Sequence, residues 1–296
     1  MVKNYFLFYV LFFAAAAALL PSCNKLNPPE VIPAYGNVDK IALTTTSPAT
    51  TGSVSTLGIT DAWIYVDDNP VGAFQMPTTF PIVASSGTHN VIIFAGIKDD
   101  GQSGQRTKYP FFTAYNVNAN LTQGSTTVFK PSITYQSWTD FAWMVDFDGG
   151  FSSLSKDNTS GVSDTSVVIT NSPEPVFEGT HSGAVYLTAK KSHFRGVSDT
   201  LILRNDGNPV YLEMNYMTNT IFTVGLISEA RSPGYVTPIV YVDTSSSWKK
   251  MYVNISQTLQ TSGSDSYRIY FQMSIDTNKQ KSATLYLDNL KLLRHK

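Results

Sequence analysis

The chain has 296 residues and a formal net charge of -1, and only 15% of its residues are charged. Nucleic-acid-binding proteins show a basic face or stripe, so this balance argues against a nucleic-acid partner. Ser, Thr, Tyr and Phe are plentiful and Glu is scarce, a composition that suits half-buried β-strands better than helices.

An apolar run from Tyr5 to Leu20 opens the chain and leads to its lone cysteine, Cys23. The run covers 16 residues, fewer than the roughly 20 that a membrane-spanning helix needs. The stretch Leu20-Pro21-Ser22-Cys23 resembles the lipobox of a bacterial lipoprotein signal peptide, although Pro21 replaces the usual small residue. The resemblance implies removal of residues 1–22 and a lipid anchor on Cys23. The alternative is an ordinary secretory signal followed by a buried thiol.

Polar and proline-bearing residues follow the cysteine over 23–37, and they predict a tether between the lipid and the first domain. Residues 38–135 then form a first module of short strands, each bounded by Gly, Asp, Asn or Pro. Strands about ten residues apart with such punctuation indicate a small β-sandwich. The expected strands span 38–46, 61–66, 71–74 and 88–97.

Within this module, residues 62–97 carry Val66-Asp67 followed by Gly72, and then the strand Gly87-Thr88-His89-Asn90-Val91. This order resembles a PEGA-like module, an Ig-like β unit. The Thr-Pro that usually follows the glycine is missing, and Met76-Pro77 stands a few residues later. The resemblance implies a surface module without catalytic residues.

An aromatic segment over 136–143 joins the two modules and contains Trp138, Phe141 and Trp143. We expect these rings to pack the interface between the modules and the first strand of the second one. A patch that binds a partner protein is the alternative.

Residues 144–296 form the second module. It opens with the acidic stretch Val145–Gly150, continues with Ser182–Leu187, has a strand led by Trp248 and ends with Asp288-Asn289. This arrangement resembles the jelly roll of carbohydrate-binding modules, which serves many functions. We therefore predict an all-β chain in which a small β-sandwich precedes a β jelly roll.

The jelly-roll resemblance implies a structural Ca²⁺ that ties the first strand to the last. Carried over to this sequence, the opening acid falls on Asp148, or on Asp146 by register, and the final acid on Asp288. Carbonyls near Thr180 and Ser182 would complete a shell of the oxygen ligands that Ca²⁺ prefers. The alternative is that these acids only accept hydrogen bonds from backbone N–H groups at strand ends.

Three strands of the second module alternate, so that one side of each meets the core and the other side is polar and aromatic. If these strands share a sheet, their outward side chains could stack on sugar rings and bond sugar hydroxyls. The alternative is an ordinary solvated sheet face. The outward residues are Tyr211, Glu213, Asn215, Trp248, Tyr252, Arg268, Tyr270 and Gln272.

Signs of catalysis are missing from the sequence. It has five Glu and four His, none in a recognisable catalytic motif, and it lacks the G-x-S-x-G, H-E-x-x-H, phosphate-loop and dinucleotide patterns. A glycosidase would need two placed carboxylates. We predict that the protein is not an enzyme and needs no cofactor beyond the structural calcium.

Together these features resemble a Bacteroidota outer-membrane lipoprotein, anchored through Cys23, with the cell surface favoured over the periplasm. The tripeptide Asp199-Thr200-Leu201 is similar to the O-glycosylation acceptor pattern of that phylum. The favoured function is an accessory or scaffold subunit that binds an outer-membrane β-barrel or other lipoproteins during assembly, secretion or import. The alternative is glycan capture by the jelly-roll face.

Overall fold

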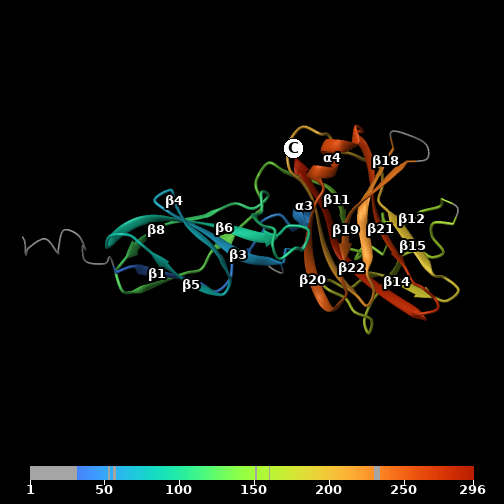
Figure 1. Cartoon of the computed structure of the whole chain (residues 1–296), viewed down its shortest axis with the longest axis horizontal. Coiled ribbons are helices and arrows are strands. Elements are labelled where there is room, and N and C mark those ends of the chain that lie inside the picture. Colours follow the sequence, from blue (N-terminus) through green and yellow to red (C-terminus); the bar gives the residue numbers. More distant parts are fainter. Residues whose placement is uncertain (1–31, 53, 56–57, 151, 160, 230–233) are drawn as a thin grey trace, which may run out of the picture.

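The computed structural model describes residues 32–296, apart from 53, 56–57, 151, 160 and 230–233. The expected signal peptide, Cys23 and most of the expected tether lie outside these described residues. Two β-rich modules follow one another along the long axis of the molecule (Figure 1). Within the described part of the chain, no helix is long and apolar enough to cross a membrane.

The first module is a small β-sandwich. Its strands form sheets with the orders β5-β1-β9, β10-β2 and β4-β3-β6-β7, and β8 pairs with β6. A four-residue helix, α3 (Pro48–Thr51), lies between β2 and β3. The strands are β1 (Ala34–Val38), β2 (Ala42–Leu43), β3 (Ile59–Val66), β4 (Asn69–Gln75), β5 (Thr78–Ile82), β6 (Gly87–Lys98), β7 (Arg106–Lys108), β8 (Tyr115–Leu121), β9 (Thr126–Phe129) and β10 (Ser132–Ile133).

This module begins earlier than its expected start at residue 38. Strand β1 includes residues 34–37, which were assigned to the tether, and it pairs with β5 and β9. Ala34, Gly36 and Val38 are buried in turn while the residues between them are half-buried. This alternating stretch is short and contains a glycine. Because prolines stand beside it, the sequence predicted a tether over these residues and not a strand. The boundary therefore lies near residue 34.

A tight turn after Val66 joins β3 to β4. Asp67 and Asp68 have φ values of 49° and 63°, as in the two-residue hairpin turns that follow the twist of the flanking strands. The Asp67 carboxylate lies 2.6 Å from Nδ1 of His89 on β6, so the turn is tied to the next strand. The strands expected over 61–66, 71–74 and 88–97 lie within β3, β4 and β6.

The second module is a jelly roll of two sheets. We call the sheet β13-β14-β22-β17-β20, with β11 paired to β22, the junction sheet. We call the sheet β12-β15-β21-β18-β19, with β16 paired to β21, the far sheet. The elements are β11 (Thr139–Val145), β12 (Ser155–Lys156), β13 (Val168–Thr170), β14 (Ser182–Thr188), β15 (His193–Val197), β16 (Leu201–Ile202), β17 (Val210–Thr218), β18 (Phe222–Ser228), β19 (Tyr235–Val242), β20 (Ser245–Asn254), α4 (Ser256–Ser262), β21 (Ser266–Ser274) and β22 (Ser282–His295).

The jelly-roll core lies between these two sheets. Leu212 and Met214 of β17 enter it from the junction sheet, and Ile269 and Phe271 of β21 enter it from the far sheet. All four side chains are 0% exposed, so the predicted alternation of these two strands is confirmed. Since successive side chains of a strand point to opposite faces, the residues between them must point away from the core.

The segment expected to be a linker over 136–143 is mostly a strand. From Thr139 onward it is β11, which pairs with β22 and has a bulge between Phe141 and Trp143. Trp143 is buried in the jelly-roll core, while Trp138 and Phe141 pack against the core of the first module. The three interface candidates therefore pack within the chain. This agrees with the expected packing role and not with the alternative of a patch that binds a partner protein.

The modules share a hydrophobic cluster. Tyr211, Tyr252 and Leu293 of the junction sheet are buried among the core residues of the first module. The ring of Tyr109 from the first module lies 5.2 Å from that of Tyr211 and 4.7 Å from that of Tyr252, measured between centroids. The end of the first module thus covers part of the junction sheet's outward face (Figure 1).

Candidate functional site

Four of the expected ligand-face residues point outward from the junction sheet but are buried. Tyr211, Glu213, Asn215 and Tyr252 are 5%, 0%, 0% and 1% exposed. Their direction follows from strand alternation, as expected. Tyr211 and Tyr252 lie beneath the first module, so they contribute to the joint between modules and are closed to a ligand from solvent.

Glu213 is the centre of a buried polar network in this joint. Its carboxylate accepts hydrogen bonds from the Tyr109 hydroxyl at 2.9 Å and from the Tyr135 hydroxyl at 3.0 and 3.1 Å. The Lys250 ammonium lies 2.5 Å from Oε2 of the same carboxylate. Two donors come from the first module and one from the second, so one carboxylate joins both.

The charges in the joint set each other's protonation. Burial alone would raise the pKa of Glu213, but Lys250 and Lys291, with the hydrogen bonds it accepts, bring that pKa below its ordinary value. Burial, with Lys250 next, lowers the pKa of Lys291 to about 8. Glu213 is therefore an ionised structural anion, since a general acid would need a raised pKa and access to substrate.

An aromatic patch occupies the part of the same face that the first module leaves uncovered. We define it as Phe177, Tyr186, Trp248 and Tyr286. The Trp248 centroid lies 5.4 Å from that of Phe177 and 6.4 Å from that of Tyr286, and Tyr286 lies 6.3 Å from Tyr186. Tyr186 is 38% exposed and the other three are half-buried. Trp248 is thus the one expected ligand-face residue of this sheet that stays accessible.

Strand register places these rings in a row. Tyr286 on β22 lies opposite Met217 on β17 and Ala184 on β14, and Tyr186 lies two residues further along β14. Trp248 continues the row on β20, the strand next to β17. Three of the rings are thus fixed on strands, which hold side chains more precisely than loops.

Glu174 anchors one end of the patch. Its carboxylate accepts the Tyr286 hydroxyl at 2.6 Å and the Tyr186 hydroxyl at 3.3 Å. Burial, followed by this hydrogen bond, raises the pKa of Tyr286, so its phenol stays protonated. The two tyrosine rings are held in place by a shared acceptor while their faces remain available.

A cavity of about 730 Å³ adjoins the patch. Tyr286 forms part of its wall, and Lys249 is the charged residue among its lining side chains. The other lining groups are hydroxyls, one amide and a methionine, so the cavity offers neutral hydrogen-bonding groups beside an aromatic ring. The remaining lining residues are Met217, Thr218, Asn219, Thr244, Ser245, Ser246, Ser247 and Thr284.

The remaining ligand-face candidates, Arg268, Tyr270 and Gln272, lie on β21 in the far sheet. They therefore do not share a face with Trp248. Nε of Arg195 donates to the Gln272 carbonyl oxygen at 2.8 Å, and its guanidinium lies 5.2 Å from the Tyr270 centroid. Arg268 pairs with Glu229 at 2.5 Å. Polar groups of this face are largely engaged with one another.

The opening acids of the expected calcium site hold a loop. Oδ1 of Asp148 accepts the Thr180 N–H at 2.7 Å, the Thr180 hydroxyl at 3.0 Å and the His181 N–H at 2.9 Å. These donors, with burial opposing them, leave the pKa of Asp148 below its ordinary value. Asp146 accepts the Asp148 N–H at 3.2 Å.

The closing acid binds Ser182, the first residue of β14, which directly follows that loop. Ser182 Oγ donates to Oδ2 of Asp288 at 2.6 Å, and burial raises the pKa of Asp288 to about 6. Within the described residues, no three His, Cys, Asp or Glu side chains gather as metal ligands. The structure thus brings Asp148 and Asp288 to the same loop, where hydrogen-bond donors occupy them, and calcium stays a prediction.

Sequence reasoning missed Phe177, Tyr186 and Tyr286. A signal existed for the two tyrosines, since Tyr186 stands between buried Val185 and Leu187, and Tyr286 between buried Leu285 and Leu287. Extending the alternation to these strands would have placed both rings outward. Phe177 lies outside any strand, so no periodicity could have indicated it.

Several solved structures are similar to part of this chain. A family 11 carbohydrate-binding module from Clostridium thermocellum, in complex with a β-1,3-1,4-mixed-linked tetrasaccharide, has 15% identity and a TM-score of 0.34, covering 50% of this chain and 93% of that one. TmCBM61 in complex with β-1,4-galactotriose has 14% identity and a TM-score of 0.34, covering 51% and 94%. Tailspike protein 4 of bacteriophage CBA120, its enzymatically active domain, has 15% identity and a TM-score of 0.34.

The match to the tailspike spans 47% of this chain but only 18% of that one. No family model matches the chain, and no curated protein sequence does. Identities and TM-scores are low, so these similarities say nothing of what this chain binds. That question rests on the side chains of its own surface, and the aromatic patch with its cavity is the strongest candidate there.

Proposed function

We propose that this protein is a non-catalytic glycan-binding protein and that it binds through the aromatic patch and the adjoining cavity. The observation that carries the proposal is the row formed by Trp248, Tyr286 and Tyr186 beside a cavity lined with hydroxyl and amide groups. Aromatic rings offer apolar faces to the C–H side of a sugar, and convergent polar groups fix its orientation.

The tilt between the rings bears on the shape of the ligand. The planes of Trp248 and Tyr286 meet at 58°, and those of Tyr286 and Tyr186 at 90°. A flat stack of polysaccharide chains would need coplanar rings. A bent surface instead suits a single, soluble chain that can turn from one ring to the next.

The proposal includes a lipid anchor and a cellular location. We place a lipid on Cys23 and the protein in the outer membrane of a Bacteroidota-type envelope, with the patch facing outward. The support is the lipobox-like sequence and the short apolar run before it. Metabolic labelling with a palmitate analogue should mark the chain and should fail after Cys23→Ala.

A second candidate is the accessory subunit of an outer-membrane complex. Strand β19 at the edge of the far sheet favours it, since Tyr235, Val236 and Tyr241 are 71%, 38% and 69% exposed. A free strand edge with apolar side chains can pair with another chain. The two candidates use different surfaces, so they can be separated by substitution.

The decisive experiment is affinity electrophoresis of the whole protein in detergent against soluble polysaccharides. Trp248→Ala and Tyr286→Ala should each weaken glycan binding at least tenfold, which corresponds to about 1.4 kcal/mol. Tyr235→Ala is the matched control, because it removes an exposed ring outside the patch.

Three results are informative. Loss of binding in the two patch variants, with the control unchanged, supports the proposal. Loss of glycan binding in Tyr235→Ala alone would move the site to β19 and overturn it. Retention of a stoichiometric partner protein that Tyr235→Ala releases, without glycan binding, would favour the accessory subunit.

A further inference from the structure

The larger sheet of the first module, β4-β3-β6-β7 with β8, has a side that faces away from the core. Ile64 of β3 and Ile93 of β6 are buried in the core, whereas the large side chains before and after each of them are half-buried and belong to no core cluster of the described residues. Successive side chains of a strand point to opposite faces, so these large side chains lie together on the other side. We call this side the outer face and define it by Trp63, Tyr65, Asn90, Ile92, Phe94, Lys108, Asn116 and Asn118.

Strand register joins the apolar side chains of the outer face in two rows. Trp63 on β3 lies opposite Phe94 on β6, and Tyr65 lies opposite Ile92. Side chains that lie opposite one another on one face of an antiparallel pair are direct neighbours. A Cβ at Gly96 would lie 2.7 Å from the indole nitrogen of Trp63, so the indole lies against the backbone of the sheet. The apolar side chains thus form a continuous surface close to the sheet.

Lys108 on β7 places a positive charge over these rings. Its ammonium lies 4.7 Å from the Phe94 centroid and 5.1 Å from the Tyr65 centroid, and it donates to the Tyr65 hydroxyl at 3.3 Å. A cation over aromatic ring faces is attracted to them, so the ammonium is held in place. Among the described residues no carboxylate lies within ion-pair distance of Lys108, and Asp61 in the same row pairs with Arg106 instead.

Asparagine side chains adjoin the rings on the outer face. Asn116 on β8 lies opposite Ile92, and Asn118 lies opposite Asn90. Nδ2 of Asn90 donates to Oδ1 of Asn116 at 2.6 Å and to Oδ1 of Asn118 at 3.3 Å. Asn116 and Asn118 are exposed, and within the described part of the chain their NH₂ groups make no hydrogen bond. These NH₂ groups are therefore available to donate to a ligand.

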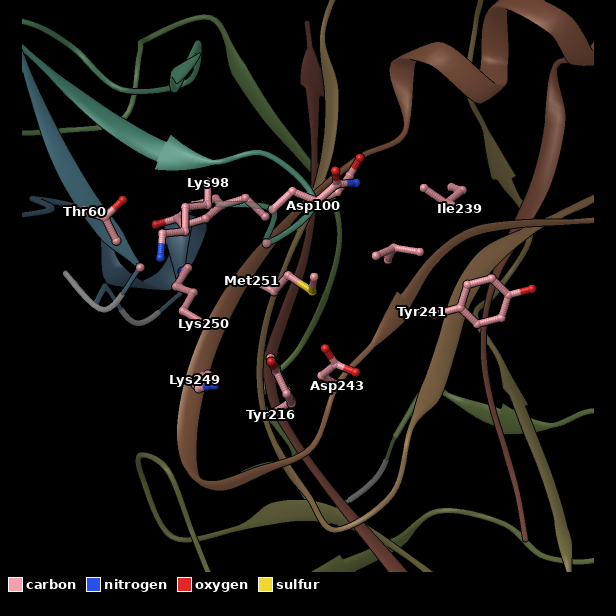
Figure 2. A pocket seen from close by; sticks show the side chains of 15 residues that line it. Thr60, Lys98, Asp100, Tyr216, Ile239, Tyr241, Asp243, Lys249, Lys250 and Met251 are labelled. Atoms are coloured by element: carbon pink, nitrogen blue, oxygen red, sulfur yellow. The ribbon is translucent and has the colours of Figure 1, made fainter. Parts of the chain in front are cut away.

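The outer face continues into a cavity of about 690 Å³ between the modules (Figure 2). Lys98, which is on the same side of β6 as Phe94, lines this cavity together with Thr60 of β3. Figure 2 shows Thr60 and Lys98 at one side of the cavity and Tyr241 of the second module at the other. A long ligand on the outer face can therefore extend toward the second module.

We propose that the outer face binds an acidic polysaccharide and that Lys108 pairs with a carboxylate or sulfate of its sugars. The rings pack against the C–H faces of the sugars, and the amides bond their hydroxyl groups. The inference goes beyond the proposed function, because this second site lies on the other module. Either site can exist without the other.

Two other occupants fit the outer face less well. Lysine is depleted in the cores of protein–protein interfaces, whereas Lys108 lies over the central rings of this surface. A helix that binds a membrane surface buries its apolar face by about 5–10 Å, whereas the apolar side chains here are half-buried and Trp63 lies against the sheet. An acidic chain rich in hydroxyl groups uses the ammonium, the amides and the rings together.

Charge-matched polysaccharides test the inference with the whole protein in detergent. Binding to immobilised homogalacturonan is compared with binding to its methyl ester, and dextran sulfate is compared with dextran. The variants are Lys108→Met, which keeps an aliphatic stem over the rings, Trp63→Ala, and Trp248→Ala in the aromatic patch. Lys130→Met is the matched control, because Lys130 is an exposed lysine of the first module outside this sheet.

We expect the unaltered chain to bind the acidic member of at least one pair about fivefold more tightly than the neutral member, a factor that one exposed ion pair can supply. Lys108→Met should remove this preference, and Lys130→Met and Trp248→Ala should keep it. Trp63→Ala should weaken binding of both members, and Lys108→Met decides the question even if Trp63→Ala fails to fold. The preference should fall as salt is added, since salt screens exposed charges.

Three outcomes would overturn the inference. If Lys108→Met keeps the preference, the ammonium does not bind the ligand. If Trp248→Ala abolishes binding while Trp63→Ala and Lys108→Met change nothing, the proposed function stands and the site on the outer face is wrong. If no polysaccharide of either pair binds, the inference is also wrong, and Lys108-dependent binding to phosphatidylglycerol vesicles would then assign the outer face to a membrane. Conversely, acidic binding that needs Lys108 and survives Trp248→Ala supports the outer face even if the aromatic patch binds nothing.

Discussion

The Tyr135 hydroxyl in the first module donates a hydrogen bond of 3.0 Å to the Glu213 carboxylate in the second. Both side chains are buried. Lys250, which lies in the same sheet as Glu213, forms an ion pair with the same carboxylate. The bond therefore fixes how the two modules sit on one another. The first module thereby covers part of the outward face of the junction sheet, where Tyr211 and Tyr252 are closed to a ligand.

Replacing Glu213 by Gln should destabilise the protein strongly. The variant keeps the shape of the side chain but leaves the Lys250 ammonium buried without its counter-charge, and breaking a buried pair costs about 3–5 kcal/mol. The free energy of unfolding, from denaturant titration, measures this. Glu229→Gln is the matched control, because its pair with Arg268 is partly exposed and worth less than about 1 kcal/mol. Equal losses in both variants would refute a special role for Glu213.

Lys291 should make stability rise with pH in mildly alkaline solution. Burial lowers its pKa from 10.5 to about 8 in the folded chain, so between these values the unfolded chain binds more protons and unfolding becomes less favourable as pH rises. Above about pH 10 the buried tyrosines oppose this, because burial raises the pKa of Tyr109 and Tyr135. Melting temperatures from pH 7.5 to 9.5 should rise in the unaltered chain relative to Lys291→Met. Parallel curves for both proteins would contradict the prediction.

Asp148→Ala should loosen the loop between β13 and β14, which ends at Thr180 and His181. It removes the acceptor of three hydrogen bonds, and we expect a loss of about 1–3 kcal/mol in unfolding free energy. The same samples, melted with calcium and with a chelator, check the calcium prediction. A higher melting temperature in calcium, absent in Asp288→Asn, would establish the ion. Identical melting would leave both acids as hydrogen-bond acceptors only.

Gly225→Ala should disturb the far sheet. A Cβ on Gly225 would run into the Thr237 carbonyl oxygen and the Tyr270 ring, which lie against it on either side. Overpacking of this kind costs about 1–3 kcal/mol. Gly104→Ala is the control, since nothing lies within 4 Å of its Cβ position. Unchanged stability in Gly225→Ala would show that β18 and β19 can shift to make room.

The sequence predicted the all-β class, the order of the modules and the direction of individual side chains. Direction is a local property, since alternation assigns Tyr211, Glu213 and Trp248 to one face whatever surrounds them. Which strands share a sheet depends on pairing between distant residues. For that reason Arg268 and Trp248, expected on one face, lie on different sheets.

The sequence also could not predict that the expected ligand face is buried. The sequence pattern around Tyr211 and Tyr252 is the same whether a sugar, water or another part of the protein covers these side chains. Only the docking of Tyr109 and its neighbours decides it. The boundary at residue 38 failed for a smaller reason, because one short alternating stretch beside prolines gives too little periodicity to separate a strand from a tether.

The shared cluster of Tyr109, Tyr211 and Tyr252 bears on how such a chain can evolve. Modules joined by a free linker are independent units, so they can be duplicated, exchanged or lost one at a time. Here a jelly roll transferred without the first module would expose Tyr211 and Tyr252, which belong to the core of that module. The β-sandwich left behind would lack these core residues. Recombination is thus expected to move the pair as one inherited unit.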